Sequence, residues 1–422
     1  MKAKTAVILA AGRGTRMNSA SPAVLHPICE RPVLCWVAEA VKPCCEDVPV
    51  IVTPAASSIP EAMGGEYRYA VQSEPVGTAD ALRRALSAEK DMAGAILVLH
   101  GNIPLVQPEY LEALAGAAEH DGAASLIWSD EENGEMREAG AWCFMDWALA
   151  EALSECTGEA SISDCVEHLK GRGVNVHELL TDPMLCMAAV DRASLWTCDY
   201  LMNARIIAEH FKNGVSLMDP ASTRIGPEVT IGRDTVIWPN VILTGKTHIG
   251  ENCVIKNGCT LNDTLIGDGC TLQHVVSNKA EVGRRVTIGP YVNLRPGTVL
   301  GDGCKVGDFV EVKNSNIGAG TKLPHLSYIG DADVGERVNV GCGTVFVNYD
   351  GFTKQRSTVG NDVFLGCQTN LIAPVTIGDE AYTAAGSTIS KSVPPKAMAF
   401  ARARQENKEG YVEIFRALKK KQ

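Results

Sequence analysis

A six-residue repeat in the second half of the chain constrains its fold more than any other feature. From Ile225 the sequence reads IGPEVT, IGRDTV, IWPNVI, LTGKTH, IGENCV and IKNGCT, and an aliphatic residue opens each unit. The same period returns further on, from Ile266, Val282, Ile317, Val334 and Val359. An aliphatic residue every six positions follows neither a helical stripe nor strand alternation, but it suits a solenoid with one inward side chain per short strand. We expect three such units to complete one triangular coil.

The repeat is interrupted at residues 348–357, where NYDGFTKQRS stands between two in-phase blocks. An insertion of this kind should leave the solenoid as a loop. Two interpretations remain open for it: a tolerated surface loop, or a binding loop that reaches a neighbouring subunit.

The first half of the chain follows a different pattern. Residues 4–10 (KTAVILA) form an apolar run that ends in the glycine-rich AAGRGTRM, and a helix-like segment begins near Pro32. A second apolar run, at 95–99, ends in HGNIPLV. Strand, glycine loop, helix and strand in this order predict a doubly wound, Rossmann-like α/β domain that binds a nucleotide at the carboxyl ends of its strands. The expected domains are an α/β domain at 1–221, a solenoid at 222–393 and a C-terminal arm at 394–422.

Composition excludes several classes of protein. The 422 residues are 45% hydrophobic, which is enough for two domains with cores and argues against a disordered chain. Lys and Arg number 39 against 50 Asp and Glu, and this acidic balance argues against a nucleic-acid or anionic-membrane binder. No apolar run approaches the roughly 18 residues of a membrane span. The 15 cysteines are scattered without a C-x-x-C pair, so we expect reduced, buried thiols in a cytoplasmic protein.

The glycine-rich segment LAAGRGTRM carries the first indication of function. Gly12 and Gly14 let the backbone approach phosphates, and Arg16 can add a charge-assisted contact. A glycine-rich turn alone is more often structural, but this segment resembles the LAAG-x-GTRM signature of sugar-nucleotide pyrophosphorylases. With a long hexapeptide solenoid after it, the chain resembles the bifunctional N-acetylglucosamine-1-phosphate uridylyltransferase / glucosamine-1-phosphate N-acetyltransferase (GlmU-type) family. That family makes UDP-N-acetylglucosamine, a cell-envelope precursor.

This resemblance implies a nucleotidyltransferase-like first domain and a left-handed parallel β-helix. It also implies a homotrimer with acetyltransferase sites between subunits, acetyl-coenzyme A as cosubstrate, and small-molecule substrates rather than nucleic acid or membrane. The resemblance covers nearly the whole chain and is strongest from about Ile288 onward, in GPYVNLRPGT, GDFVEVKNSNIG, HLSYIGDADVG, VNVGCGT and VNYDG.

Carried over to this sequence, the resemblance makes His325 the general base and lets Glu311 orient its imidazole. The base would take a proton from the amine of glucosamine-1-phosphate as that amine attacks the acetyl thioester. Histidine suits the task, because an ammonium group is not nucleophilic and an imidazole near neutral pH accepts its proton. A lone histidine in a solenoid more often has a surface or packing role, but here its neighbours match the family's spacing.

The resemblance also assigns the binding residues of this site. Those that would hold the sugar phosphate and orient the amino sugar are Arg295, Lys313, Tyr328, Asn339, Asn348, Tyr349 and Lys354. Those that would contact coenzyme A are Cys342, Cys367, Ala385 and Arg402. The cations Arg295 and Lys313 suit a dianionic phosphate. Cys342 and Cys367 stand where the family has small residues, and cysteine is also small, so we expect the site to stay open.

The first domain departs from its family at two charged positions. The family's P-K-V-L segment reads PAVL here, so Ala23 replaces a lysine that binds phosphates. Asn102 replaces the aspartate that binds Mg²⁺, and an amide brings no charge to offset the metal. A second expected Mg²⁺ ligand survives as Asn203 in LMNAR. Nucleotidyl transfer depends on this electrostatic stabilisation, so we predict that uridylyl transfer is impaired or absent.

The expected sugar side and nucleotide side of the first domain's site differ in how many of the family's motifs they keep. The stretch 128–145 (WSDEENGEMREAGAWCFM) has no counterpart of the family's sugar-contacting motifs. The nucleotide side is better kept, and its candidate residues are Ala11, Gly12, Gly14, Arg16, Gln72, Gly77 and Thr78. We therefore expect acetyl-coenzyme A as cosubstrate, with Mg²⁺ needed only if uridylyl transfer is retained.

Three other functions remain open at this point. The chain can be fully bifunctional, or it can be a non-catalytic binding protein whose first domain senses a uridine nucleotide or scaffolds a partner. It can also acylate a different amino sugar, although Arg295 and Lys313 favour a phosphorylated acceptor.

Overall fold

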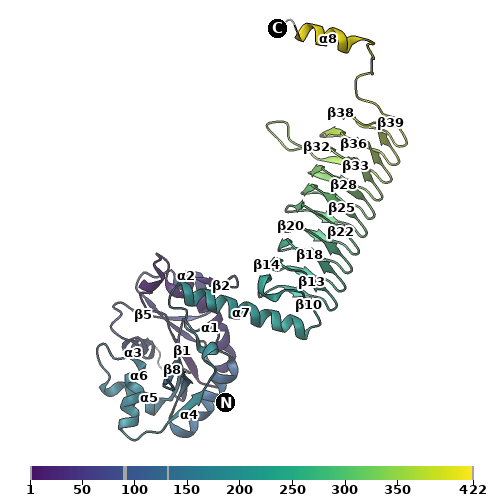
Figure 1. Cartoon of the computed structure of the whole chain (residues 1–422). Coiled ribbons are helices and arrows are strands. Elements are labelled where there is room, and N and C mark those ends of the chain that lie inside the picture. The colour runs from purple at the N-terminus through teal and green to yellow at the C-terminus, as the bar shows by residue number, and fades with distance from the viewer. Residues whose placement is uncertain (1, 89–92, 131–132, 421–422) are drawn as a thin grey trace. The chain divides into compact units, whose positions relative to one another are not determined.

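The computed structural model describes residues 2–88, 93–130 and 133–420 of the chain. They form two compact units, Met1–Ile206 and Ile207–Gln422 (Figure 1). The division falls inside helix α7 (Arg192–Lys212), ahead of the boundary proposed from the sequence. The first solenoid strand, β10 (Ser216–Leu217), also precedes that boundary and pairs with β13 (Val236–Ile237).

The first unit is built on a seven-stranded sheet with the order β5-β4-β1-β6-β8-β7-β9. Among the described strands of this sheet, only β8 runs antiparallel to its neighbours, β6 and β7. The strand bounds are β1 (Thr5–Leu9), β4 (Val50–Pro54), β5 (Arg68–Gln72), β6 (Ala95–His100), β7 (Ala123–Ser129), β8 (Met136–Met145) and β9 (Val176–Leu180). Every residue of β1 is buried, as expected for a central strand with both faces covered.

Helices cover both faces of this sheet. Ile8 and Leu97 of the strands pack with residues of α1 (Val33–Val41) and α4 (Pro108–Asp121). Val7 and Val98, which point to the other face, pack with residues of α3, α5 and α6. These three helices are α3 (Thr78–Ala88), α5 (Asp146–Glu155) and α6 (Ile162–Gly171). The predicted α/β fold of the first half is thus confirmed.

The second unit is a parallel β-helix whose short strands form three sheets of 11, 10 and 9 strands. Ile237, Ile255, Leu272 and Ile288 lie in register on successive coils, and each is buried. One inward aliphatic residue per strand and three strands per coil explain the six-residue period. Strand pairing continues to β39 (Met398–Ala399), which pairs with β37 (Tyr382–Thr383), so the solenoid is longer at both ends than 222–393.

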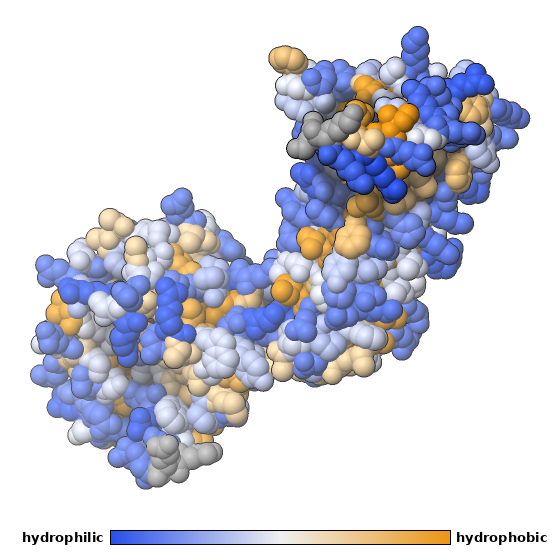
Figure 2. Space-filling view, turned by 45° about the horizontal axis from the view of Figure 1, so that its top comes forward, coloured by the Kyte–Doolittle hydropathy of each residue, from blue (hydrophilic) through white to orange (hydrophobic). Residues whose placement is uncertain are grey.

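The interruption at 348–357 is a loop that leaves the coil between β32 (Val345–Val347) and β33 (Ser357–Val359) (Figure 1). After the last coil the chain ends in α8 (Tyr411–Lys419), whose residues are all exposed. The surface seen in Figure 2 is largely hydrophilic, with hydrophobic residues in small patches. In the part of the chain described here, no helix is long and apolar enough to cross a membrane. All fifteen cysteines are free thiols.

Candidate active site

One corner of the β-helix brings the predicted base together with an acidic residue. His325 ends β28 (Lys322–His325), and Asp308 ends β25 (Lys305–Asp308) directly beside it in the sheet. The two side chains approach each other to 3.6 Å between His325 Nδ1 and Asp308 Oδ2. The Leu326 amide donates to the Asp308 carbonyl, so the two turns are also stacked through their backbones.

The predicted coenzyme A residues continue this column of turns on the following coils. The Gln368 amide donates to the Cys342 carbonyl, and the Gly386 amide donates to the Cys367 carbonyl. The coils stack so closely that a Cβ atom at Gly366 would lie 2.6 Å from the Ala385 amide nitrogen. Cys342, Cys367 and Ala385 therefore line one edge of the solenoid with small side chains. The Arg402 side chain lies beyond them, against Gly386.

Two lysines and an aspartate form a charged cluster on the adjoining sheet. Lys313 ends β26 (Glu311–Lys313), and its Nζ lies 3.9 Å from Asp331 Oδ2. Burial alone would raise the pKa of Asp331, but hydrogen bonds from Asn314 and Asn348 and the charge of Lys313 hold that pKa below its ordinary value. Lys313 also lowers the pKa of Lys354, because two ammonium groups stand side by side. Two cations this close favour an anion between them.

Tyr328 and Asn348 meet over a glycine next to this cluster. Tyr328 begins β29 (Tyr328–Gly330), and Asn348 Nδ2 donates to the Tyr328 hydroxyl over 3.4 Å. Asn348 also donates to Asp331, which ties the insertion to the coil. A Cβ atom at Gly330 would lie 2.4 Å from Tyr328 Oη and 2.7 Å from Asn348 Nδ2. Only glycine allows this approach of the two side chains.

The remaining predicted residues take different positions. Arg295 Nη1 donates to Glu311 Oε1 over 2.8 Å, so the carboxylate expected at the imidazole faces the guanidinium here. Asn339 begins β31 (Asn339–Val340), opposite Lys322 of β28. Tyr349 pairs with Lys354 in an antiparallel bridge inside the loop.

The structure adds two acidic residues that the sequence did not single out, Asp308 and Asp331. Asp308 approaches His325, 17 positions later in the chain, and Asp331 approaches Lys313, 18 positions earlier. An offset of one coil was therefore the signal that could have found them.

The first unit has a cavity of about 570 Å³ at the carboxyl ends of its strands. The predicted nucleotide residues that line it are Ala11, Gly12, Gly14, Arg16, Gln72, Gly77 and Thr78. Gly14 has a left-handed backbone (φ 59°), and a Cβ atom there would lie 2.6 Å from the Cβ of Ala23. Gln72 Nε2 donates to the Gly77 carbonyl, and Thr78 Oγ1 accepts from the Ile162 amide. These contacts hold the loop between β5 and α3 in place against the start of α6.

The charged side chains that line this cavity are Arg13 and Arg16, and its described lining holds no carboxylate. Asn102 reaches the cavity, whereas Asn203 is buried on α7 and is not part of the lining. Mg²⁺ prefers carboxylates and phosphates as ligands. The donors that this chain supplies there are neutral, so they do not fit a resident Mg²⁺ ion. Guanidinium groups beside a glycine loop do fit a polyphosphate.

The fold and the two sites together define a nucleotidyltransferase-like domain followed by a hexapeptide-repeat transferase domain. A MobA-like NTP transferase domain matches residues 6–173, and the bacterial transferase hexapeptide (six repeats) matches residues 228–263 and 279–314. The second unit is therefore a left-handed parallel β-helix.

Curated relatives match over the full length of the chain. A protein of Geobacillus thermodenitrificans (strain NG80-2) named "Bifunctional protein GlmU" is 40% identical, with 100% of both chains covered. A protein of the same name from Geobacillus sp. (strain WCH70) is 39% identical, with 98% of both chains covered. One from Listeria monocytogenes serotype 4a (strain HCC23) is 38% identical, with 97% of this chain and 98% of the relative covered. The chain belongs to the bifunctional GlmU family.

Proposed function

We propose that the β-helix unit transfers an acetyl group from acetyl-coenzyme A to glucosamine-1-phosphate and forms N-acetylglucosamine-1-phosphate. The observation that carries the proposal is the place of His325. On one side of His325 lies the column of small side chains. On its other side lies β29, which begins with Tyr328 and pairs with the strand that carries Lys313, and Lys354 stands beside Lys313. In this arrangement the small side chains can bind the long thioester, the two lysines can bind the sugar phosphate, and His325 lies between the two as the base.

In the proposed reaction, Lys313, Lys354 and Arg295 hold the phosphate, and Tyr328 and Asn348 orient the sugar. The imidazole of His325 takes one proton from the bound ammonium group, which frees the nitrogen lone pair. That nitrogen attacks the thioester carbonyl, and the C–S bond breaks as the amide forms. The nitrogen gives up its second proton, the departing thiolate takes a proton and leaves as the thiol of coenzyme A, and the proton on His325 passes to solvent. Atoms balance without a covalent enzyme intermediate.

We propose a cytoplasmic homotrimer with this site at a subunit contact. A ridge of exposed apolar side chains, Tyr291, Phe309 and Leu326, runs along the corner next to His325. Phe352 in the loop is 93% exposed, which is rare for a ring that never meets a partner. Free thiols throughout fit a reducing compartment.

For the first unit we propose nucleotide binding with impaired uridylyl transfer. The support is a cavity that keeps all seven predicted nucleotide residues, yet has Ala23 and Asn102 where charged groups are expected. The second candidate is a fully bifunctional enzyme, which the name shared by the relatives favours. In that case Mg²⁺ would be required for the uridylyl step.

One incubation separates these functions. The purified chain is mixed with glucosamine-1-phosphate, acetyl-coenzyme A, UTP and Mg²⁺, and the products are identified by mass. Detection by mass is preferable to a thiol reagent, because Cys367 is exposed. N-acetylglucosamine-1-phosphate alone supports the proposal for both units, and UDP-N-acetylglucosamine supports the bifunctional alternative. If UTP binds and neither product forms, the chain is a nucleotide-binding protein and the proposal fails.

A further inference from the structure

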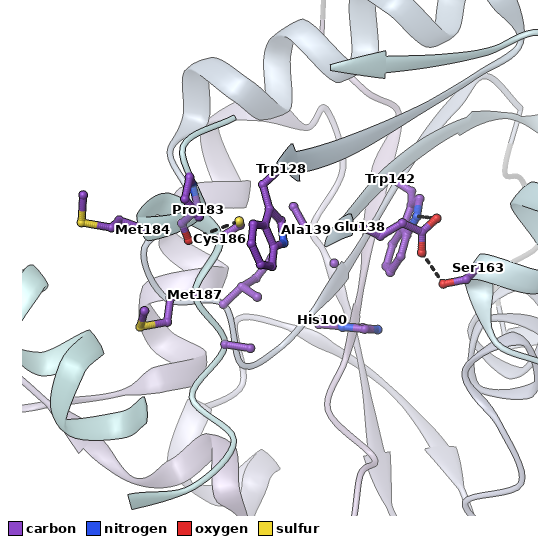
Figure 3. Close-up of a pocket in the computed structure, with 13 residues that line it drawn as sticks. His100, Trp128, Glu138, Ala139, Trp142, Ser163, Pro183, Met184, Cys186 and Met187 are labelled. Carbon is purple, nitrogen blue, oxygen red and sulfur yellow. Dashed lines mark hydrogen bonds between the residues drawn. The ribbon is translucent and has the colours of Figure 1, made fainter. Parts of the chain in front are cut away.

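A second cavity of the first unit, of about 500 Å³, adjoins the nucleotide cavity (Figure 3). His100 and Ala188 line both cavities. In Figure 3, Met184, Cys186 and Met187 lie on one side of Trp128, and His100 and Trp142 lie on its other side. The size falls in the range of small-molecule sites, and most of the wall is aromatic, aliphatic or sulfur-bearing.

The charged side chain of this cavity is already engaged by two of its neighbours. Glu138 is the one lining residue with a formal charge within the described chain, and both of its carboxylate oxygens accept hydrogen bonds. Trp142 Nε1 donates to Oε1 over 3.2 Å, and Ser163 Oγ donates to Oε2. Burial lowers the pKa of His100, so its imidazole is neutral at pH 7, and its ring packs edge-on against Trp142 with 5.1 Å between centroids.

Such walls suit an apolar ligand better than a sugar. Each buried hydroxyl of a pyranose needs a hydrogen-bond partner, and the Glu138 carboxylate already accepts from Trp142 and Ser163. Indole rings and thioethers instead favour flat aromatic groups through stacking and sulfur contacts. We infer that this cavity binds the apolar, aromatic part of a small molecule, next to a nucleotide held by the glycine loop. This inference is independent of acetyl transfer in the second unit.

The test uses N-phenyl-1-naphthylamine, a neutral fluorescent probe, and the full-length chain. We expect saturable binding at one site per chain, with quenching of tryptophan emission because Trp128 and Trp142 form the wall. Met184→Glu places a charge in the lining and should weaken probe binding at least tenfold. Met136→Glu is the matched control, because the two methionines are 52% and 53% exposed and Met136 does not line the cavity. It should bind the probe as wild type does.

Three results would overturn the inference. They are the absence of saturable probe binding, equal affinity in the two methionine variants, and displacement of the probe by N-acetylglucosamine-1-phosphate. Both variants carry their change on an exposed side chain, so each should keep wild-type acetyl transfer in the β-helix unit. That activity serves as the check on folding.

A separate observation assigns a positioning role to Asp308. We infer that Asp308 holds the His325 imidazole in place for proton transfer, because the two residues pair in register and their side chains lie 3.6 Å apart. Glu311, the residue implied for this role, faces Arg295 at 2.8 Å. This inference rests on the proposed acetyl transfer. In this assignment Asp308 serves the base His325, and Glu311 serves the guanidinium of Arg295, which we propose binds the phosphate.

Kinetics of two variants test this division. Asp308→Asn should lower kcat at least tenfold and leave KM for glucosamine-1-phosphate nearly unchanged, and Asp308→Glu should restore part of kcat. Glu311→Gln should mainly change KM through Arg295. If wild type is active and Asp308→Asn keeps full kcat, or if only Glu311→Gln lowers kcat, the positioning role belongs elsewhere. If wild type itself lacks acetyl transfer, the proposed function fails instead.

Discussion

Replacing Gly330 by alanine should disable the acceptor side of the β-helix site while the coil stays folded. The added Cβ atom would lie 2.4 Å from Tyr328 Oη, 2.6 Å from Tyr328 Cζ and 2.7 Å from Asn348 Nδ2. Carbon atoms in contact keep roughly 3.5–4.0 Å, so the phenol and the amide must each move by about 1 Å. Both are ends of flexible side chains, so they can yield without a change in the backbone.

A displacement of about 1 Å in a positioning group can cost roughly 10²-fold in rate. We therefore expect kcat/KM for acetyl transfer to fall by about that factor in Gly330→Ala, measured by product mass under initial-rate conditions. Gly116→Ala is the control, because a Cβ atom there meets nothing within 4 Å. A folded Gly330→Ala protein with wild-type kcat/KM would refute the argument that Tyr328 and Asn348 position the acceptor.

Further predictions concern charge, the core and assembly. Lys313→Met should raise KM for glucosamine-1-phosphate about 10- to 100-fold, since a hydrogen bond to a charged group contributes roughly 1.5–3 kcal/mol. Lys305→Met, an exposed change on β25, should leave that KM unaltered, and an equal KM in both variants would remove Lys313 from the phosphate site. Phe346→Ala should destabilise the β-helix by about 3–5 kcal/mol, because the ring is fully buried; denaturant unfolding measures this, and a loss below about 1 kcal/mol would contradict it. Light scattering should give the mass of three chains, and a monomer would contradict the proposed trimer.

The repeat made the β-helix predictable in detail. One aliphatic side chain per six residues and three strands per coil follow directly from the way Ile237 and Ile255 stack inside the solenoid. The glycine loop and the segment around Gln72 could also be placed, because they follow β1 and β5 and parallel strands bring their carboxyl ends to one edge. Local sequence therefore sufficed to bring the seven candidate residues to one cavity.

Side-chain partners across coils were harder to predict. The offset between neighbours is 17 residues for Asp308 and His325, 18 for Lys313 and Asp331, and 25 for Arg337 and Asp362, which flank the inserted loop. The six-residue period therefore predicts the coil to which a residue belongs, but it does not predict which side chain it contacts on the next coil. Asn203 illustrates a second limit: its motif suggested a metal ligand, yet α7 buries it away from the cavity lining.

The most direct measurement of the central claim compares wild type with His325→Ala in the presence of glucosamine-1-phosphate and acetyl-coenzyme A alone. We predict that wild type adds one acetyl group to the sugar phosphate, and that the variant does so at least roughly 10²-fold more slowly at an unchanged oligomeric state. Equal rates in the two proteins, or unmodified glucosamine-1-phosphate with wild type, would contradict the account.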